Sequence, residues 1–233
     1  MVGQALSPAN RFFSAPAPRV KMPLVSESPV CYSGIPPGGA VPHTIAALLK
    51  GLRSPSAGVK YGSAKSLRLL SEQSPARLYP HFDLFFGLFE GDNTILRWGS
   101  TRILGNLAAV DREGKLDAAF DRFFTPVLGR EMIGAANVIA AAAQIALAKP
   151  QFADRISAEI LKVERASYRT PECRNVAIGH ALQSLDRFFP HVTQPGPVIE
   201  FVQRQLTNPR PATRRKAERF LKRWTACSAR GPL

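Results

Sequence analysis

Acidic residues are scarce in this sequence of 233 residues. It has 17 Asp and Glu against 31 Lys and Arg, which gives a formal net charge of +14 at pH 7. Such an imbalance favours partners that carry negative charge, namely nucleic acid, an anionic membrane surface or an acidic protein. The charge therefore restricts the class of partner before anything is known of the fold.

Cysteine is also scarce, with three residues that lie far apart: Cys31, Cys173 and Cys227. No Cys-x-x-Cys pair or Cys/His ligand spacing occurs, which argues against a disulfide framework and a zinc site. A reducing compartment, and hence a cytoplasmic location, is the simplest prediction. Apolar runs of about 18 residues are absent as well, so no membrane span is predicted.

Proline is unevenly distributed, since eight of the 20 prolines fall within residues 1–42. Proline removes backbone donors and interrupts helices, and this Pro/Ser/Gly-rich composition has little to bury. We therefore predict a disordered tail over residues 1–42, a repeat domain over 43–225 and a disordered C-terminal tail over 226–233. Whether residues 1–42 are a targeting segment stays open.

A repeat appears from residue 43 onward. Four of its five segments have a basic residue near their start, namely Lys60, Arg97, Arg174 and Arg214. These residues are 37, 77 and 40 positions apart. The gap of 77 corresponds to two repeats, and the remaining segment, the third along the chain, lies within it and lacks the basic residue. A period near 37–40 residues lies close to that of helical repeats, about 34–47. The five segments are Val59–Leu67, Leu96–Leu104, Met132–Ile139, Cys173–Ala181 and Thr213–Leu221.

Each segment has an apolar residue, usually a cation, then a small pair such as Ser63-Ala64 or Ser100-Thr101, and a later apolar residue such as Leu104. This motif resembles the second helix of a HEAT repeat, as found in uncharacterised bacterial HEAT-repeat proteins. The resemblance implies an all-α fold, a right-handed α-α superhelix (HEAT/armadillo-like solenoid) of about five helical hairpins. The third and fourth segments depart from the motif, which leaves their register open.

Aromatic stripes precede two of these segments, at spacings of three and four residues that place them on one helix face. Neighbouring hairpins must stack to bury such faces. The stripes are Phe82, Phe85, Phe86 and Phe89, and then Leu116, Phe120, Phe123 and Phe124.

The positive charge is concentrated near the C-terminus. Residues 43–200 have 19 Lys and Arg against 15 Asp and Glu, whereas residues 201–233 have nine against one. In the predicted last helix, Ala217, Phe220, Leu221 and Trp224 form an apolar stripe and cations cover the remaining surface. This helix is either a contact surface for an acidic partner or the polar cap that a terminal solenoid repeat needs.

Alignment of the segments also predicts a row of aromatic and basic residues on the helix faces opposite the buried stripes. Such a row would bind a nucleic acid by stacking on its bases and contacting its phosphates, or an acidic peptide by contacting its carboxylates. The alternative is that Tyr61 and Trp98 simply pack between neighbouring units. No catalytic, cofactor or metal residues are predicted. The predicted macromolecule-binding residues are Tyr61, Lys65, Arg68, Trp98, Arg102, Arg215, Arg219 and Lys222.

Two hypotheses for the function follow. The first is a non-enzymatic scaffold that binds an acidic protein partner on its repeat surface. The alternative is a nucleic-acid-binding HEAT-like protein, which resembles, in architecture only, the alkylpurine DNA glycosylases. That family places Trp and Asp residues on a basic concave face; Trp98 is the candidate for the Trp, and no Asp matches. The nearly neutral charge of residues 43–200 favours the protein scaffold. The oligomeric state stays open.

Overall fold

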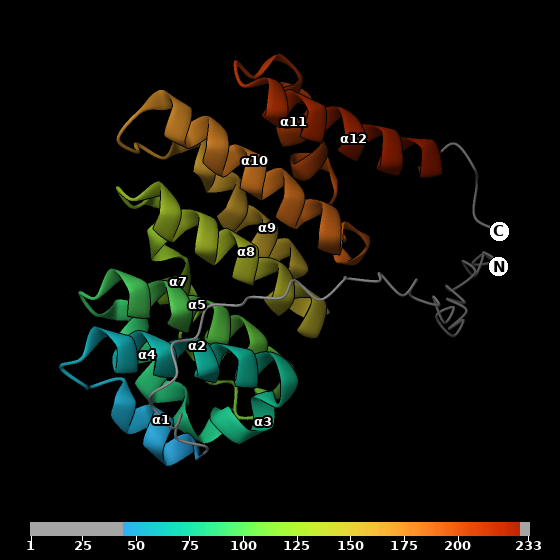
Figure 1. Ribbon diagram of the computed structural model, residues 1–233. Helices are drawn as coiled ribbons and strands as arrows, with labels where there is room; N and C mark the ends of the chain where they lie inside the picture. Colours follow the sequence, from blue (N-terminus) through green and yellow to red (C-terminus); the bar gives the residue numbers. More distant parts are fainter. Residues whose placement is uncertain (1–43, 229–233) are drawn as a thin grey trace, which may run out of the picture. The chain divides into compact units, whose positions relative to one another are not determined.

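The computed structural model describes residues 44–228, and side chains up to Trp224. All regular secondary structure within these residues is helical (Figure 1), so the predicted all-α class is confirmed. The predicted tail 1–42 lies outside the described residues. The last helix ends at Ser228, and the predicted tail over residues 226–233 lies mostly outside the described residues.

Five helical hairpins follow one another along the chain, as the repeat predicts. Consecutive second helices pack against each other, so they form one layer of the stack. The first helices are α1 (Ile45–Gly51), α3 with α4 (Pro75–Leu78 and Phe82–Glu90), α6 with α7 (Lys115–Ala118 and Phe120–Phe124), α9 (Ala153–Leu161) and α11 (Gly196–Arg204). The second helices are α2 (Ala57–Gln73), α5 (Thr94–Leu107), α8 (Met132–Ala148), α10 (Pro171–Phe188) and α12 (Pro211–Ser228).

The interiors of the second helices contain no proline, and two of these helices, α10 and α5, have side-chain caps at their starts. Thr170 Oγ1 accepts a hydrogen bond from the Cys173 amide at 3.2 Å, with Pro171 at the first helical position. Asn93 Oδ1 accepts from the Leu96 amide at 3.1 Å. Side-chain caps of this kind satisfy amides that have no partner within the helix. The first helices are instead short, and Pro80 and Pro126 lie in 3-10 turns that border them.

The core lies between the two layers of helices. All eight residues of the two predicted stripes are buried. Phe89 of the second hairpin stacks on Phe123 of the third, with ring centroids 5.3 Å apart. Small residues allow close approach of the second helices: a Cβ at Gly105 of α5 would lie only 3.0 Å from the Cβ of Ala141 in α8. The hairpins therefore share one core and depend on each other for burial.

A buried polar cluster also ties the second hairpin to the third. The Asp111 carboxylate accepts from the Tyr79 hydroxyl at 2.6 Å, the Lys149 ammonium at 2.8 Å, and the amides of Lys115 and Leu116 at 2.9 and 3.1 Å. Burial raises the pKa of Asp111, but the hydrogen bonds from Lys149 and Tyr79 outweigh it and hold the pKa below its usual value. A buried carboxylate is stable only when satisfied in this way.

Two cations of the first-helix layer, Arg122 and Arg155, are paired with acids of the preceding hairpin. Arg122 lies 4.8 Å from the Phe86 ring centroid and pairs with Glu90. One hairpin later, Arg155 lies 3.8 Å from the Phe120 centroid and pairs with Asp121 at 2.6 Å. Arg122 and Arg155 therefore serve the stacking of the hairpins and add little to the positive surface.

Candidate macromolecule-binding surface

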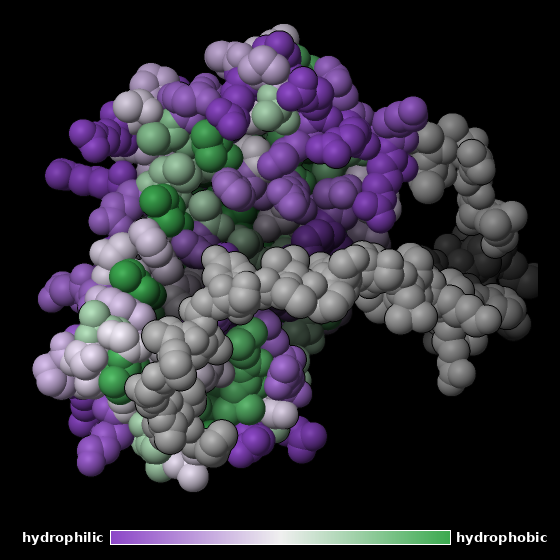
Figure 2. All heavy atoms as spheres, viewed as in Figure 1, coloured by the Kyte–Doolittle hydropathy of each residue, from purple (hydrophilic) through white to green (hydrophobic). Residues whose placement is uncertain are grey.

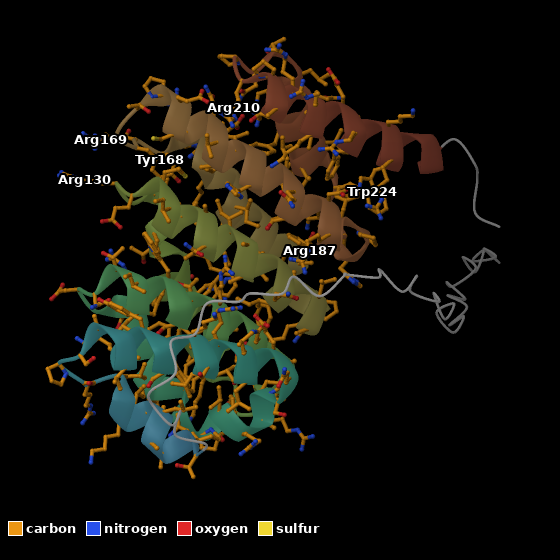
Figure 3. All side chains as sticks on the ribbon, in the orientation of Figure 1. Arg130, Tyr168, Arg169, Arg187, Arg210 and Trp224 are labelled. Atoms are coloured by element: carbon orange, nitrogen blue, oxygen red, sulfur yellow. The ribbon has the colours of Figure 1, made fainter. Side chains whose placement is uncertain are left out.

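An exposed set of cations lies on α10 and α12, and we call it the basic face. It consists of Arg187, Arg215, Arg219 and Lys222. Within residues 44–224, none of these four side chains has a carboxylate within ion-pair distance. Figure 3 labels Arg187 near the C-terminal end of α10, beside the end of α12 that carries Trp224. The three predicted residues of the last helix are thus solvent-exposed, and the structure adds Arg187 to them.

A groove with a volume of about 430 Å³ lies between α10 and α12 and is bordered by Lys216 and Arg219. The Lys216 ammonium donates to the Gly179 carbonyl at 2.8 Å. Burial, with Arg219 and Arg210 nearby, lowers the pKa of Lys216. Burial and the charges of Lys216 and Arg210 likewise lower the pKa of His180. Both shifts reflect partial burial and a positive potential at this end of the repeat stack.

Trp224 packs against α10 and the turn after it, and so stabilises the last hairpin. Its indole Nε1 donates to Asp186 Oδ1 at 2.7 Å, and its ring centroid lies 5.3 Å from that of Phe189. The predicted apolar stripe of α12 is buried at Ala217 and Phe220 but only partly buried at Leu221 and Trp224. Trp224 is therefore a peripheral packing residue rather than a fully buried one.

Replacing Trp224 with Ala should lower the free energy of unfolding by about 2 kcal/mol, below the 3–5 kcal/mol typical of a fully buried aromatic. The change removes part of the apolar contact with Phe189 and the hydrogen bond to Asp186. Urea unfolding followed by circular dichroism measures it. Trp224→Phe, which keeps most of the ring contact, should cost less than half as much, and equal losses for both variants would refute this assignment.

The predicted residues of α2 are largely engaged in local contacts. Tyr61 packs partly against the core, and its hydroxyl accepts from Asn93 Nδ2 at 3.3 Å. Arg68 pairs with Glu72 one helical turn away. Lys65 is exposed. Tyr61 thus corresponds to the alternative in which the aromatic residue packs between neighbouring units.

The two predicted residues of α5 differ in their exposure to solvent. Arg102 is exposed and forms no ion pair with the described residues. Trp98 is partly buried, and its Nε1 is buried without a hydrogen-bond partner. Between α5 and the basic face, the outer positions Ala140, Gln144 and Leu147 of α8 carry no charge. The structure therefore does not join the eight predicted residues into one continuous row.

Sequence analysis missed a second set of cations, which we call the turn arginines: Arg130, Arg169 and Arg210. Each precedes a second helix by one or two residues, and Figure 3 shows them near the starts of α8, α10 and α12. Arg130 and Arg169 are exposed, whereas Arg210 pairs with Glu172. Their spacings of 39 and 41 residues follow the repeat, and an alignment extended into the turns would have found them.

No group of His, Cys, Asp and Glu among the described residues has the geometry of a metal site. None of the helices in residues 44–228 combines the length and the apolarity needed to cross a bilayer.

Comparison with known proteins assigns no family to the chain. No protein-family model matches the chain, and no curated protein does. Among solved structures, the designed armadillo repeat protein YIII(Dq)4CqI is similar to it, with 15% sequence identity and a TM-score of 0.48 over 76% of this chain and 81% of the other. The chain is a repeat helical solenoid on the evidence of its own stacked hairpins.

Proposed function

We propose that the chain is a non-enzymatic scaffold of the HEAT type that binds an acidic segment of a protein partner on the basic face. The observation that carries the proposal is the exposed, unpaired charge of the four cations of the basic face. Arg122 and Arg155 of the first-helix layer, by contrast, pair with acids of the preceding hairpin. Cations of the basic face have no such partner among residues 44–224. We expect this scaffold in the cytoplasm.

Unpaired cations on a terminal helix are more than a solubility device. A polar cap can use both charge signs, yet α12 contains Glu218 as its single acid. Like charges on one helix face repel each other and cost stability, by about 0.2–0.5 kcal/mol for each adjacent pair. A surface that bears this cost is best accounted for by a partner of opposite charge.

Nucleic acid is the less favoured partner for two reasons. A polyanion favours a continuous row of cations, and the outer positions of α8 interrupt it with Ala140, Gln144 and Leu147. Stacking on bases requires exposed aromatic faces, but Tyr61 and Trp98 are partly buried. A protein partner needs only a local acidic segment.

The test compares two triple charge reversals in the full chain. The first is Arg215→Glu, Arg219→Glu and Lys222→Glu on the basic face. The control is Lys50→Glu, Arg77→Glu and Arg112→Glu, which changes the net charge equally at exposed positions elsewhere. Binding of a fluorescein-labelled polyglutamate peptide is measured by fluorescence anisotropy at low and high salt.

Reversal of the basic face should weaken binding by about 100-fold at low salt, which corresponds to about 1 kcal/mol for each charge. The control should change it by less than about fivefold through net charge alone. Both variants should keep the helical circular dichroism of the wild type, because exposed substitutions usually cost within about 0.5 kcal/mol. Equal weakening by the two variants would mean that binding depends on net charge and that α12 is a soluble cap.

A further inference from the structure

A second candidate site lies away from the basic face, at the edge where the second helices begin and where the second and third hairpins meet. A cavity of about 260 Å³ opens there between the start of α5 and the turn that precedes α8. Its walls are mostly apolar and include Phe89, Trp98 and Pro126. This volume suits one large apolar side chain rather than a drug-sized ligand, for which pockets run from about 300 to 1,000 Å³.

Trp98, which lines the cavity, has a donor that the protein itself does not use. The Trp98 Nε1 atom is buried and has no hydrogen-bond partner among the described residues. Buried indole N–H groups usually find a partner, because an unmet donor loses its hydrogen bond to water without compensation. A ligand with an acceptor oxygen next to its apolar group, such as a peptide carbonyl, satisfies this donor when its binding opens the indole edge, which is closed to solvent in the free chain.

Exposed apolar side chains continue from the cavity along the edge where the second helices begin. Val59, Ile95 and Ile133 stand in the first turns of α2, α5 and α8 and are 48, 49 and 48% exposed, and Leu128 in the turn before α8 is 53% exposed. Figure 2 shows separate apolar areas along this edge on the left of the view. Large apolar residues that recur at one repeat position mark an interaction surface more strongly than scattered ones do.

The same edge becomes basic toward the C-terminal hairpins. Arg130 borders the cavity and, like Arg169, is exposed without an acidic partner among residues 44–224. Arg97 also borders it, but it pairs with Glu131 at 3.0 Å. The chain's own N-terminal segment is a poor match for this edge, because residues 1–43 contain three Lys and Arg and one Glu.

We propose that this edge binds a short acidic peptide segment of a partner protein, with one large apolar side chain in the Trp98 cavity. The peptide carbonyl beside that side chain accepts from Trp98 Nε1, and its carboxylates lie over Arg130 and Arg169. Two or three inter-helix steps of about 8–10 Å separate the cavity from the start of α12. About five to nine extended residues span that distance. The site goes beyond the proposed function, since it uses none of the basic face.

The probe is a synthetic acidic peptide of about twelve residues with one central Phe, labelled with fluorescein, and its matched version has Ala in place of Phe. Both are titrated into the full chain by anisotropy. The chain has two Trp residues, so two-dimensional ¹H–¹⁵N NMR follows the Trp98 indole signal, assigned with Trp98→Phe. Arg130→Glu tests whether the arginine that borders the cavity contributes to peptide binding. Arg77→Glu on α3 reverses an exposed charge elsewhere and is its control.

The Phe peptide should bind at least about tenfold more tightly than the Ala peptide, as expected for burial of one aromatic side chain. It should shift the Trp98 indole signal. Arg130→Glu should weaken binding at least about fivefold, while Arg77→Glu changes it less than about twofold. The triple reversal of the basic face should leave the Phe-to-Ala ratio unchanged, which separates this site from the proposed function.

Equal affinity for the two peptides, or an unmoved Trp98 signal at saturation, would overturn the proposal. So would equal effects of Arg130→Glu and Arg77→Glu. A fourth contrary outcome concerns the chain's own tail. If Phe12→Ser with Phe13→Ser moves the Trp98 signal without any peptide, the N-terminal segment occupies the cavity and an external partner is excluded.

Discussion

Replacing Asp111 with Ala should lower the free energy of unfolding by about 3–5 kcal/mol, the range for breaking a buried ion pair by removing one partner. The Asp111 side chain is 0% exposed and accepts four hydrogen bonds. Its loss leaves the buried Lys149 ammonium with Asp117 as its remaining acidic partner, at 2.5 Å. The Tyr79 hydroxyl loses its acceptor as well. Urea unfolding at neutral pH measures the change.

The control is Asp83→Ala, since that carboxylate is 83% exposed and lies 3.6 Å from the Lys115 ammonium. It should change stability by less than about 1 kcal/mol. A similar loss for both variants would show that the buried cluster contributes no more than a surface pair.

The pH dependence of stability gives a second measurement of the same cluster. Because the pKa of Asp111 is lowered in the folded state, its contribution is fully present above the unfolded value of about 3.9. It is lost as the pH falls through the lowered folded pKa. Asp111→Asn should therefore show a weaker fall in stability below about pH 4 than the wild type. An unchanged acid slope in this variant would contradict the assignment.

Replacing Phe123 with Ala should cost about 3–5 kcal/mol, the range for truncating a large aromatic in a core. Phe123 is fully buried and stacks on Phe89 of the preceding hairpin. Because the hairpins share this contact, the unfolding curve should also become less cooperative, with a reduced denaturant slope. Chemical denaturation followed at several wavelengths tests both expectations.

Leu206→Ala is the matched control, because Leu206 is 38% exposed on the last hairpin. It should cost less than about 1 kcal/mol and leave the slope unchanged. A loss of stability at Phe123 without any change in slope would mean that the hairpins unfold together even when one interface is weakened.

The stack of hairpins could be predicted from the sequence because its determinants are local and periodic. The spacing of the Phe82–Phe89 stripe, the small pairs of the second helices and the Thr170 cap are each visible within one or two helical turns of sequence. The buried cluster could not be predicted in this way. Lys149 and Asp111 are 38 residues apart, and their pairing depends on how one hairpin docks on the next.

The candidate site could be predicted only in part. The cations of α12 stood out because they break the charge balance of the chain, and the structure leaves Arg215, Arg219 and Lys222 exposed. The predicted row of aromatic residues depended on helix rotation, which periodicity does not fix closely enough to tell a half-buried Trp98 from an exposed one. The turn arginines followed the repeat but fell outside the helical motif that was aligned.

The salt dependence of duplex DNA binding by the full chain tests the central claim most directly. A local basic face of four cations predicts that the logarithm of the association constant falls with the logarithm of salt at a slope no steeper than about −4. It also predicts only weak binding, with a dissociation constant above about 1 µM at physiological salt. A slope of about −6 or steeper with submicromolar binding at that salt would show that a larger surface follows the phosphates, and it would contradict a scaffold for acidic proteins.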